Sequence, residues 1–283
     1  MNLLVLPLFL LASFCTSSVL GAPTVDTKEE LSVIEPPKAR ITEISQRSRN
    51  LSESVLAEEL SGEFEGDILL TEQQYRDITR RNGRLPERYR WPNKVVFYQI
   101  EDYAFYQDQL DQIYLAMQTI EAATCVRFQQ RYTTTADYVY IVEGSSGCSS
   151  FVGRIGGVQE LKLFPDSVGT GCFRLGTIMH ELIHAIGFRH MQSTYNRDDY
   201  VRIMWENLQP GSEHNFQLYG SDQVSNFGTA YDYGSIMHYS ATAFSINGQK
   251  TIVALKETNQ VMGQRNGLSQ TDILKIKKMY NCA

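Results

Sequence analysis

The sequence lacks the features that mark two large classes of protein. After residue 21 no apolar run approaches the roughly 20 residues that a membrane-spanning helix needs, so the mature protein is expected to cross no membrane. Basic residues form no cluster denser than Lys275, Lys277 and Lys278, and residues 82–283 carry 19 acidic against 18 basic side chains. A nearly neutral domain has no electrostatic footprint for nucleic acid, which excludes a nucleic-acid-binding protein.

The N-terminus predicts export. Residues 3–11 form an apolar run that is too short to span a bilayer, and small residues follow where a signal peptidase could cut. We therefore expect a signal peptide over residues 1–21 and a secreted, extracellular protein, with a buried N-terminal helix as the alternative. Cysteine is scarce, but the four that follow residue 21 are even in number: Cys125, Cys148, Cys172 and Cys282. In an exported chain they suggest two disulfides, and the residues alone leave all three connectivities open.

The stretch from residue 22 to residue 81 differs in composition from the rest. It holds 13 acidic and 8 basic side chains and only scattered apolar residues, so it cannot build a core of its own. Asn50 opens a glycosylation sequon, which needs an exposed chain. Arg81 and Asn82 lie at a dibasic, turn-forming site that a trypsin-like protease could cleave. One interpretation of this stretch is a flexible arm, and a more specific one is a removable pro-segment.

Residues 82–283 carry the patterns of a folded domain. The predicted strands cover residues 95–100, 126–128, 138–142 and parts of 151–163, and the predicted helices cover residues 110–120, 175–186 and 269–279. Gly187 supplies the end of the second helix, and Ser269 with Asp272 predicts a capping box for the last. Because helices and strands mix without regular βαβ alternation, the sequence predicts an α+β fold.

Residues 180–190, with the sequence HELIHAIGFRH, carry the strongest chemical signal. His180 and His184 lie four positions apart, so a helix places both imidazoles on one face. Gly187 can take a positive φ and end the helix, which lets His190 reach the same ion. Three neutral nitrogens bind Zn²⁺ and leave one position open for water, as a catalytic zinc site requires. Glu181 lies close enough to take the proton of that water as a general base.

A second segment completes this pattern. The extended HExxHxxGxxH motif followed by a methionine-containing turn is typical of metzincin peptidases. Met237 lies in such a turn, where its thioether can form the floor of the site. Tyr239 offers a phenol to the metal or to a developing oxyanion. His238, in contrast, is predicted to be structural, because an extended strand would point it away from its neighbours.

These motifs, together with RDDYV at 197–201 and SIMHY at 235–239, resemble those of the astacin-type zinc endopeptidases over residues 90–282. The resemblance implies a two-lobed catalytic domain, with a mixed twisted sheet and the zinc helix in the N-terminal lobe. An irregular C-terminal lobe ending in a helix would follow. The resemblance also implies disulfides from Cys125 to Cys282 and from Cys148 to Cys172, and Tyr239 as a movable fifth ligand of the metal.

The segment FEGDI at 64–68 is similar to the family's inhibitory motif, in which an aspartate binds zinc in place of the catalytic water. The resemblance assigns that role to Asp67, and Gly66 would let the backbone come near. One departure is Met191, which stands where the family usually has a glutamate that helps to anchor the mature N-terminus. We therefore expect activity to depend only weakly on the exact N-terminal residue.

Three hypotheses follow for function. The first is a secreted zinc endopeptidase, made as a monomeric zymogen with signal peptide, pro-segment and catalytic domain, that cleaves proteins or peptides after activation by a trypsin-like protease. The second is a non-catalytic binding module on the same scaffold, and the third is an esterase or amidase that acts on small molecules. Because Glu181 and every ligand are present, the sequence favours the first.

Overall fold

The computed structural model describes residues 56–79 and 87–283. The predicted signal peptide, the sequon at Asn50 and the predicted cleavage site at Arg81 and Asn82 lie outside these residues. Among the helices of the described ranges, none combines the length and the apolar character needed to cross a bilayer.

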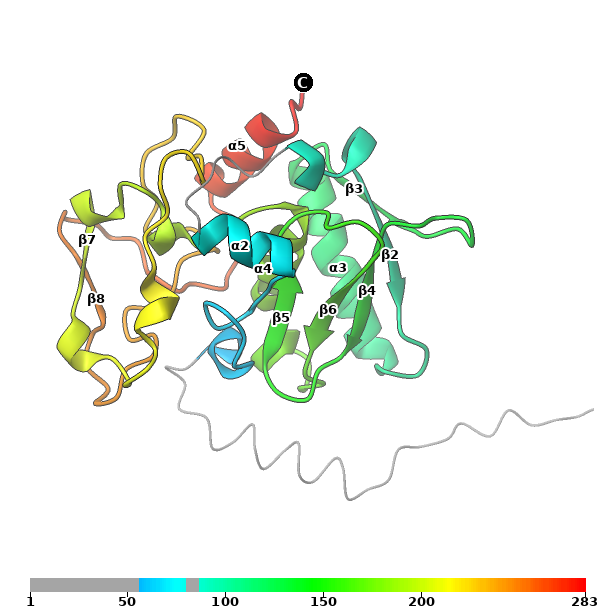
Figure 1. Ribbon diagram of the computed structural model, residues 1–283. Coiled ribbons are helices and arrows are strands. Elements are labelled where there is room, and N and C mark those ends of the chain that lie inside the picture. The colour runs from blue at the N-terminus through cyan, green and yellow to red at the C-terminus, as the bar shows by residue number, and fades with distance from the viewer. Residues whose placement is uncertain (1–55, 80–86) are drawn as a thin grey trace, which may run out of the picture. The chain divides into compact units, whose positions relative to one another are not determined.

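One mixed sheet organises the N-terminal half of the domain. Its strands lie in the order β1-β5-β6-β4-β2-β3 (Figure 1). Their bounds are β1 (Ile68–Leu69), β2 (Val95–Ile100), β3 (Arg127–Gln130), β4 (Tyr138–Glu143), β5 (Cys148–Phe151) and β6 (Val158–Leu163). Of the pairs in this sheet, β5 with β6 is antiparallel and the others are parallel. The predicted α+β class and the mixed sheet are thus confirmed.

Strand boundaries differ most from the expectation around residue 151. Phe151 ends β5, whereas the sequence pattern placed further strands from Phe151 onward. Gly153, Gly156 and Gly157 all have a positive φ, at 71°, 87° and 73°, and they turn the chain between β5 and β6. Such a conformation is costly for residues with a Cβ, so these glycines set where β5 ends and where β6 begins.

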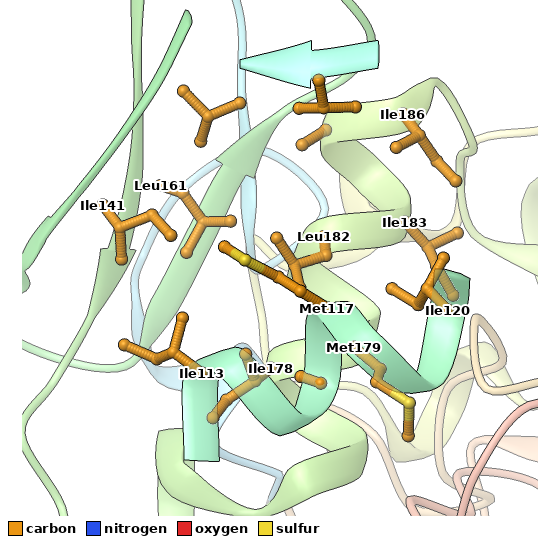
Figure 2. Close-up of a cluster of buried hydrophobic side chains, with 14 of the residues drawn as sticks. Ile113, Met117, Ile120, Ile141, Leu161, Ile178, Met179, Leu182, Ile183 and Ile186 are labelled. Carbon is orange, nitrogen blue, oxygen red and sulfur yellow. The ribbon is translucent and has the colours of Figure 1, made fainter. Parts of the chain in front are cut away.

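Two helices cover the sheet and build the main core. They are α3 (Gln107–Ala123) and α4 (Leu175–Ile186). Figure 2 shows the apolar side chains of α3 and α4 facing one another, with Ile141 and Leu161 from the sheet beside them. The labelled side chains from the two helices are Ile113, Met117, Ile120, Ile178, Met179, Leu182, Ile183 and Ile186. Because α4 is buried on all sides, its position is fixed by packing as well as by hydrogen bonds.

The last turn of α4 is held by side chains from both ends of the domain. The indole Nε1 of Trp91 donates to Ala185 O at 2.8 Å, and Tyr280 Oη donates to Ile186 O at 2.7 Å. These bonds satisfy two carbonyls that the end of a helix leaves without an intrahelical partner. The disulfide between Cys125 and Cys282 ties the same C-terminal end to the chain beyond α3.

The C-terminal half has little regular structure. It contains β7 (Val201–Ile203) paired with β8 (Ile252–Ala254), several 3₁₀ turns and a second apolar cluster, and it ends in α5 (Gln270–Met279). The predicted capping box of α5 is present, since Ser269 Oγ accepts from Asp272 N at 2.9 Å and Asp272 Oδ2 accepts from Ser269 N at 3.0 Å. The second disulfide joins Cys148 to Cys172. Both pairings are those that the resemblance implies.

Candidate metal centre

Helix α4 places two histidines on one face and then ends sharply. His180 and His184 are both fully buried. Gly187 has a φ of 119°, and its N–H donates to His184 O at 2.8 Å. A left-handed glycine of this kind closes a helix without steric cost. The chain then turns back, and His190 comes to lie beside the other two imidazoles.

A carboxylate from the N-terminal segment completes the cluster. Asp67 lies with His180, His184 and His190 in a buried group whose potential ligand atoms are all within 4.8 Å of one another. Its Oδ2 is 3.0 Å from His180 Nε2 and 3.2 Å from His190 Nε2, and its Oδ1 is 3.4 Å from His184 Nε2. The four side chains that the sequence predicted as metal ligands therefore lie together.

The hydrogen bonds of the imidazoles test whether this group fits a cation. Each Nδ1 faces an acceptor: Ile236 O for His180 at 2.8 Å, Phe188 O for His184 at 2.7 Å, and Glu65 Oε2 for His190 at 2.9 Å. Placing each proton on Nδ1 leaves a lone pair on every Nε2. The Nε2 atoms of His180 and His184 then lie 3.1 Å apart with no hydrogen between them.

Such a set of converging acceptors fits zinc. Ligand atoms of a tetrahedral zinc are about 3.3 Å apart, because each bond is about 2.0–2.1 Å long. The observed separations between the nitrogen and oxygen atoms run from 3.0 to 3.4 Å. A buried site with this spacing and these donors is suited to Zn²⁺.

Glu181 lies beside the ligands but does not join them. Its side chain is fully buried, and neither carboxylate oxygen has a hydrogen-bond partner among the described residues. Burial raises the pKa of Glu181 well above its usual range, and the negative charges of Asp67 and Glu58 raise it further. A buried carboxyl without partners, placed next to a metal site, is typical of a group that exchanges protons.

The methionine-containing turn forms the other wall of the site. Met237 O accepts from Met191 N at 2.9 Å, and Ile236 O accepts from the His180 ring. Asp272 holds this turn in place, since its carboxylate accepts from Ser235 Oγ at 2.6 Å and from Ile236 N at 2.9 Å. The capping residue of α5 thus also orients the backbone that binds the first histidine.

Tyr239 and His238 leave this turn in different directions. Tyr239 Oη donates to Glu65 O at 2.5 Å, and its ring lies 4.6 Å from the His190 ring between centroids. His238 Nε2 instead bonds to Tyr231 Oη at 2.8 Å, away from the cluster. Tyr239 is therefore held at the metal centre by the N-terminal segment.

Sequence reasoning missed the role of Glu65. This glutamate is fully buried and accepts from His190 Nδ1, from Ser193 Oγ at 3.4 Å and, through a short bond, from Tyr219 Oη. Arg189 donates to the same Tyr219 oxygen at 2.9 Å. Since an arginine can only donate, the phenol must direct its own hydrogen to Glu65. The one available signal was position, because Glu65 lies two residues before Asp67.

Residues 56–79, called here the docked segment, bind the domain at further points. Glu58 pairs with Arg265 at 2.6 Å, with both side chains almost fully buried. Asp67 O accepts from Ser150 N at 2.8 Å as β1 adds to β5. Helix α2 (Glu72–Thr79) follows, and Gln74 Nε2 donates to Val152 O at 2.8 Å. The composition of residues 22–81 predicted no independent core, and the described part packs on the domain instead.

Glu59 makes the binding of the docked segment pH-dependent. Burial raises the pKa of its carboxyl to about 7, Glu58 adds to this shift, and the Phe244 N–H and Arg265 oppose it. The docked state therefore favours the protonated carboxyl. The contribution of the Glu59 carboxyl to binding of the docked segment is fully present below about pH 4.5, the ordinary pKa of a glutamate. It is lost as the pH rises through about 7.

We therefore expect Glu59→Gln to match the wild type at pH 5 and to bind the segment more tightly at pH 8, by about 2–3 kcal/mol. Amide hydrogen exchange in residues 57–60, compared between variants at each pH, measures this difference. Glu72→Gln, at an exposed position of α2, is the matched control. Equal exchange in the wild type and Glu59→Gln at pH 8 would contradict the assignment.

Comparison with known proteins agrees with this site. The sequence model of the family described as Astacin (Peptidase family M12A) matches residues 84–281. Seminal metalloprotease 1 of Drosophila melanogaster is 40% identical over 230 residues, which cover 79% of this chain and 88% of that protein. Zinc metalloproteinase nas-15 of Caenorhabditis elegans is 43% identical over 193 residues, but these cover 68% of this chain and only 32% of that protein.

A solved structure agrees as well. The hatching enzyme zinc-protease High choriolytic enzyme 1 of Oryzias latipes superposes with a TM-score of 0.64 and 40% identity, covering 70% of this chain and 97% of that one.

Proposed function

The chain belongs to the astacin family of zinc metalloendopeptidases, and from this premise we propose how its residues cleave peptide bonds and how the docked segment prevents cleavage. We assign Glu181 as the general base and Tyr239 as the donor to the oxyanion. We assign Asp67 as the metal ligand of a zymogen, in which residues 22–81 form the pro-segment.

Catalysis depends on a proton transfer that Glu181 is placed to make. His180, His184 and His190 would hold the zinc, which when bound would supply Lewis acidity to polarise the scissile carbonyl and to lower the pKa of a water molecule toward about 7. Both oxygens of Glu181 are without hydrogen-bond partners in the described part of the chain, so the carboxylate can accept the proton. It then passes the proton to the leaving amine.

Tyr239 is proposed to act once the docked segment has left. Burial, followed by the charges of Glu65 and Asp67, raises the pKa of its phenol well above the usual range, so the hydroxyl keeps its proton. In the described state the Tyr239 hydroxyl donates a hydrogen bond to Glu65 O. After release of the segment, the same hydroxyl can donate to the negative oxygen that forms on the substrate carbonyl.

Inhibition is proposed to use two carboxylates of the docked segment. Asp67 faces all three Nε2 atoms and so occupies the position that water needs. Glu65 binds the Nδ1 side of His190 and the Tyr219 hydroxyl. Glu65 has a φ of 48°, a conformation that costs a residue with a Cβ about 1 kcal/mol or more. The contacts of its side chain and of Gly66 offset that cost.

Processing and location follow from the sequence. We propose a signal peptide at residues 1–21, secretion, glycosylation at Asn50 and activation by a trypsin-like protease between Arg81 and Asn82. The catalytic domain is proposed to act as a monomer on proteins or peptides. The two disulfides support an oxidising compartment.

The observation that carries the proposed function is the buried cluster of three Nε2 atoms beside an unpaired Glu181. We expect the trypsin-activated chain to digest denatured casein, to lose this activity with its zinc on treatment with 1,10-phenanthroline, and to regain both when Zn²⁺ is added. Mg²⁺ is the matched control and should restore neither, because it prefers oxygen ligands. Full casein digestion by protein shown by elemental analysis to be metal-free would overturn the proposal, as would cleavage of small esters alone.

A further inference from the structure

A cavity of about 400 Å³ lies next to the metal centre. Its wall includes Ile183 and His190 from the zinc-binding region, Met237 from the turn beneath it, and Lys275 from α5. Glu181, Asp67 and Tyr239 do not line it. The catalytic roles assigned above therefore leave this cavity unexplained.

Lys275 is the unusual residue of the cavity. It is only 7% exposed, although an ammonium has three donors and no acceptor. Within the described residues its Nζ has one hydrogen-bond partner, Met191 Sδ at 2.9 Å. A thioether is a weak acceptor, so most of the hydrogen-bonding capacity of a buried cation is unmet. Buried charges in proteins are ordinarily paired, because desolvation without a partner is costly.

The nearest acidic residue does not supply the missing partner. Asp272 lies one turn before Lys275, but its carboxylate already accepts from Ser235 Oγ, Ile236 N and Ser269 N. No ion pair joins it to Lys275. Burial lowers the pKa of the Lys275 ammonium, and Asp272 and Asp232 act in the opposite direction. The two aspartates thus act on the lysine only at a distance.

Basic side chains outnumber acidic ones in the wall of the cavity. Arg90, Arg189 and Lys278 also line the cavity, against Glu87 and Asp272 on the acidic side. Glu87 is already 3.5 Å from Arg90. The preceding residues 80–86 have the sequence RRNGRLP, with three arginines and no acid, so their side chains offer no carboxylate. Among the described residues, the wall therefore carries an excess of positive charge, and none of its carboxylates bonds to the Lys275 ammonium.

We propose that this cavity is an anion-binding site, in which Lys275 binds a small carboxylate or an inorganic oxyanion from solution. Either ligand presents several oxygen acceptors, and bonds from an ammonium to a charged oxygen are roughly twice as strong as neutral ones. A water molecule takes about 30 Å³, so the cavity is large enough for acetate or sulfate together with water. Anion binding in this cavity requires none of the proposed catalytic roles.

Thermal unfolding of the full, uncleaved chain tests the proposal. The probes are sodium acetate and sodium sulfate, each titrated at constant ionic strength against sodium chloride. Comparing the two titrations shows whether the site prefers a carboxylate or an inorganic oxyanion. We expect at least one of them to raise the unfolding midpoint saturably, by about 2–4 °C, because it binds only the folded state. Lys277→Gln, an exposed position on the same helix, should respond like the wild type. Lys275→Met should lose the saturable response.

Met191→Glu provides a second and independent variant. A carboxylate at this position would pair with Lys275 internally, so we expect a raised midpoint without added anion and no further response to acetate or sulfate. Lys275→Met should also show a raised midpoint without anion, since it removes an unpaired buried charge. A rise that does not saturate and is equal in all variants would be the general exclusion effect of salts and would overturn the proposal. A saturable response in Lys275→Met or Met191→Glu that is unchanged from the wild type would also overturn the proposal.

Discussion

Glu181→Gln is expected to leave one zinc bound per chain and to reduce peptide cleavage by about 10²–10⁴-fold. That range is typical of a lost general acid–base group, and the amide cannot accept the proton that the reaction must move. Zinc binding should survive, because Glu181 lies outside the ligand group of Asp67, His180, His184 and His190. Elemental analysis of the activated variant and its rate on a fluorogenic peptide give the two measurements.

A matched control separates this effect from damage to the fold. Glu206→Gln makes the same chemical change at an exposed position and should keep wild-type activity. The unfolding midpoint of Glu181→Gln should not fall, since neither oxygen of the native carboxylate has a hydrogen bond to lose within the described residues. Cleavage at more than a tenth of the wild-type rate, with zinc bound, would remove Glu181 from the role of base.

Asp67→Ala is expected to make the uncleaved chain active. Removing one member of a buried charged group typically costs about 3–5 kcal/mol, and each 1.4 kcal/mol is a factor of ten. The fraction of chains with the docked segment displaced should therefore rise at least about 100-fold. The comparison is made with Arg80→Ala and Arg81→Ala also present, so that the segment stays attached, and a fluorogenic peptide reports the activity.

The control for Asp67→Ala lies in the same segment. Asp77→Ala changes a partly exposed aspartate, whose ion pair with Arg88 is 3.6 Å long, and should leave the chain inactive. Glu58→Ala should give a smaller gain than Asp67→Ala, because it breaks the pair with Arg265 without opening the metal centre. If Asp67→Ala stays as inactive as Asp77→Ala, the segment inhibits by covering the site rather than through its carboxylate.

The predictions that the structure confirms depend on residues that lie close together in the sequence. His180 and His184 are one helical turn apart, and the place where α4 ends is set by the single left-handed residue Gly187. The capping box of Ser269 and Asp272 is equally local. In each case the physical cause lies within a few residues, so the sequence alone contains it.

Contacts between distant segments account for what was missed. Glu65 and Tyr219 are separated by 154 positions, and nothing in the composition of either neighbourhood points to the other. Asp272 likewise looks like a simple helix cap, although it also holds Ser235 and Ile236 beside the metal centre. Both roles arise only when tertiary packing brings the partners together, which local propensity and periodicity do not encode.

Trp91 and Tyr280 bind the last turn of α4, so the segment that follows α5 helps to hold the helix of the metal ligands. Loss of Tyr280 would leave Ile186 O without its donor, and loss of Cys282 would break the disulfide to Cys125. Proteolysis before residue 280 would therefore loosen the helix that carries His184, although Tyr280 lies 94 positions away from Ile186, the last residue of that helix, in the sequence.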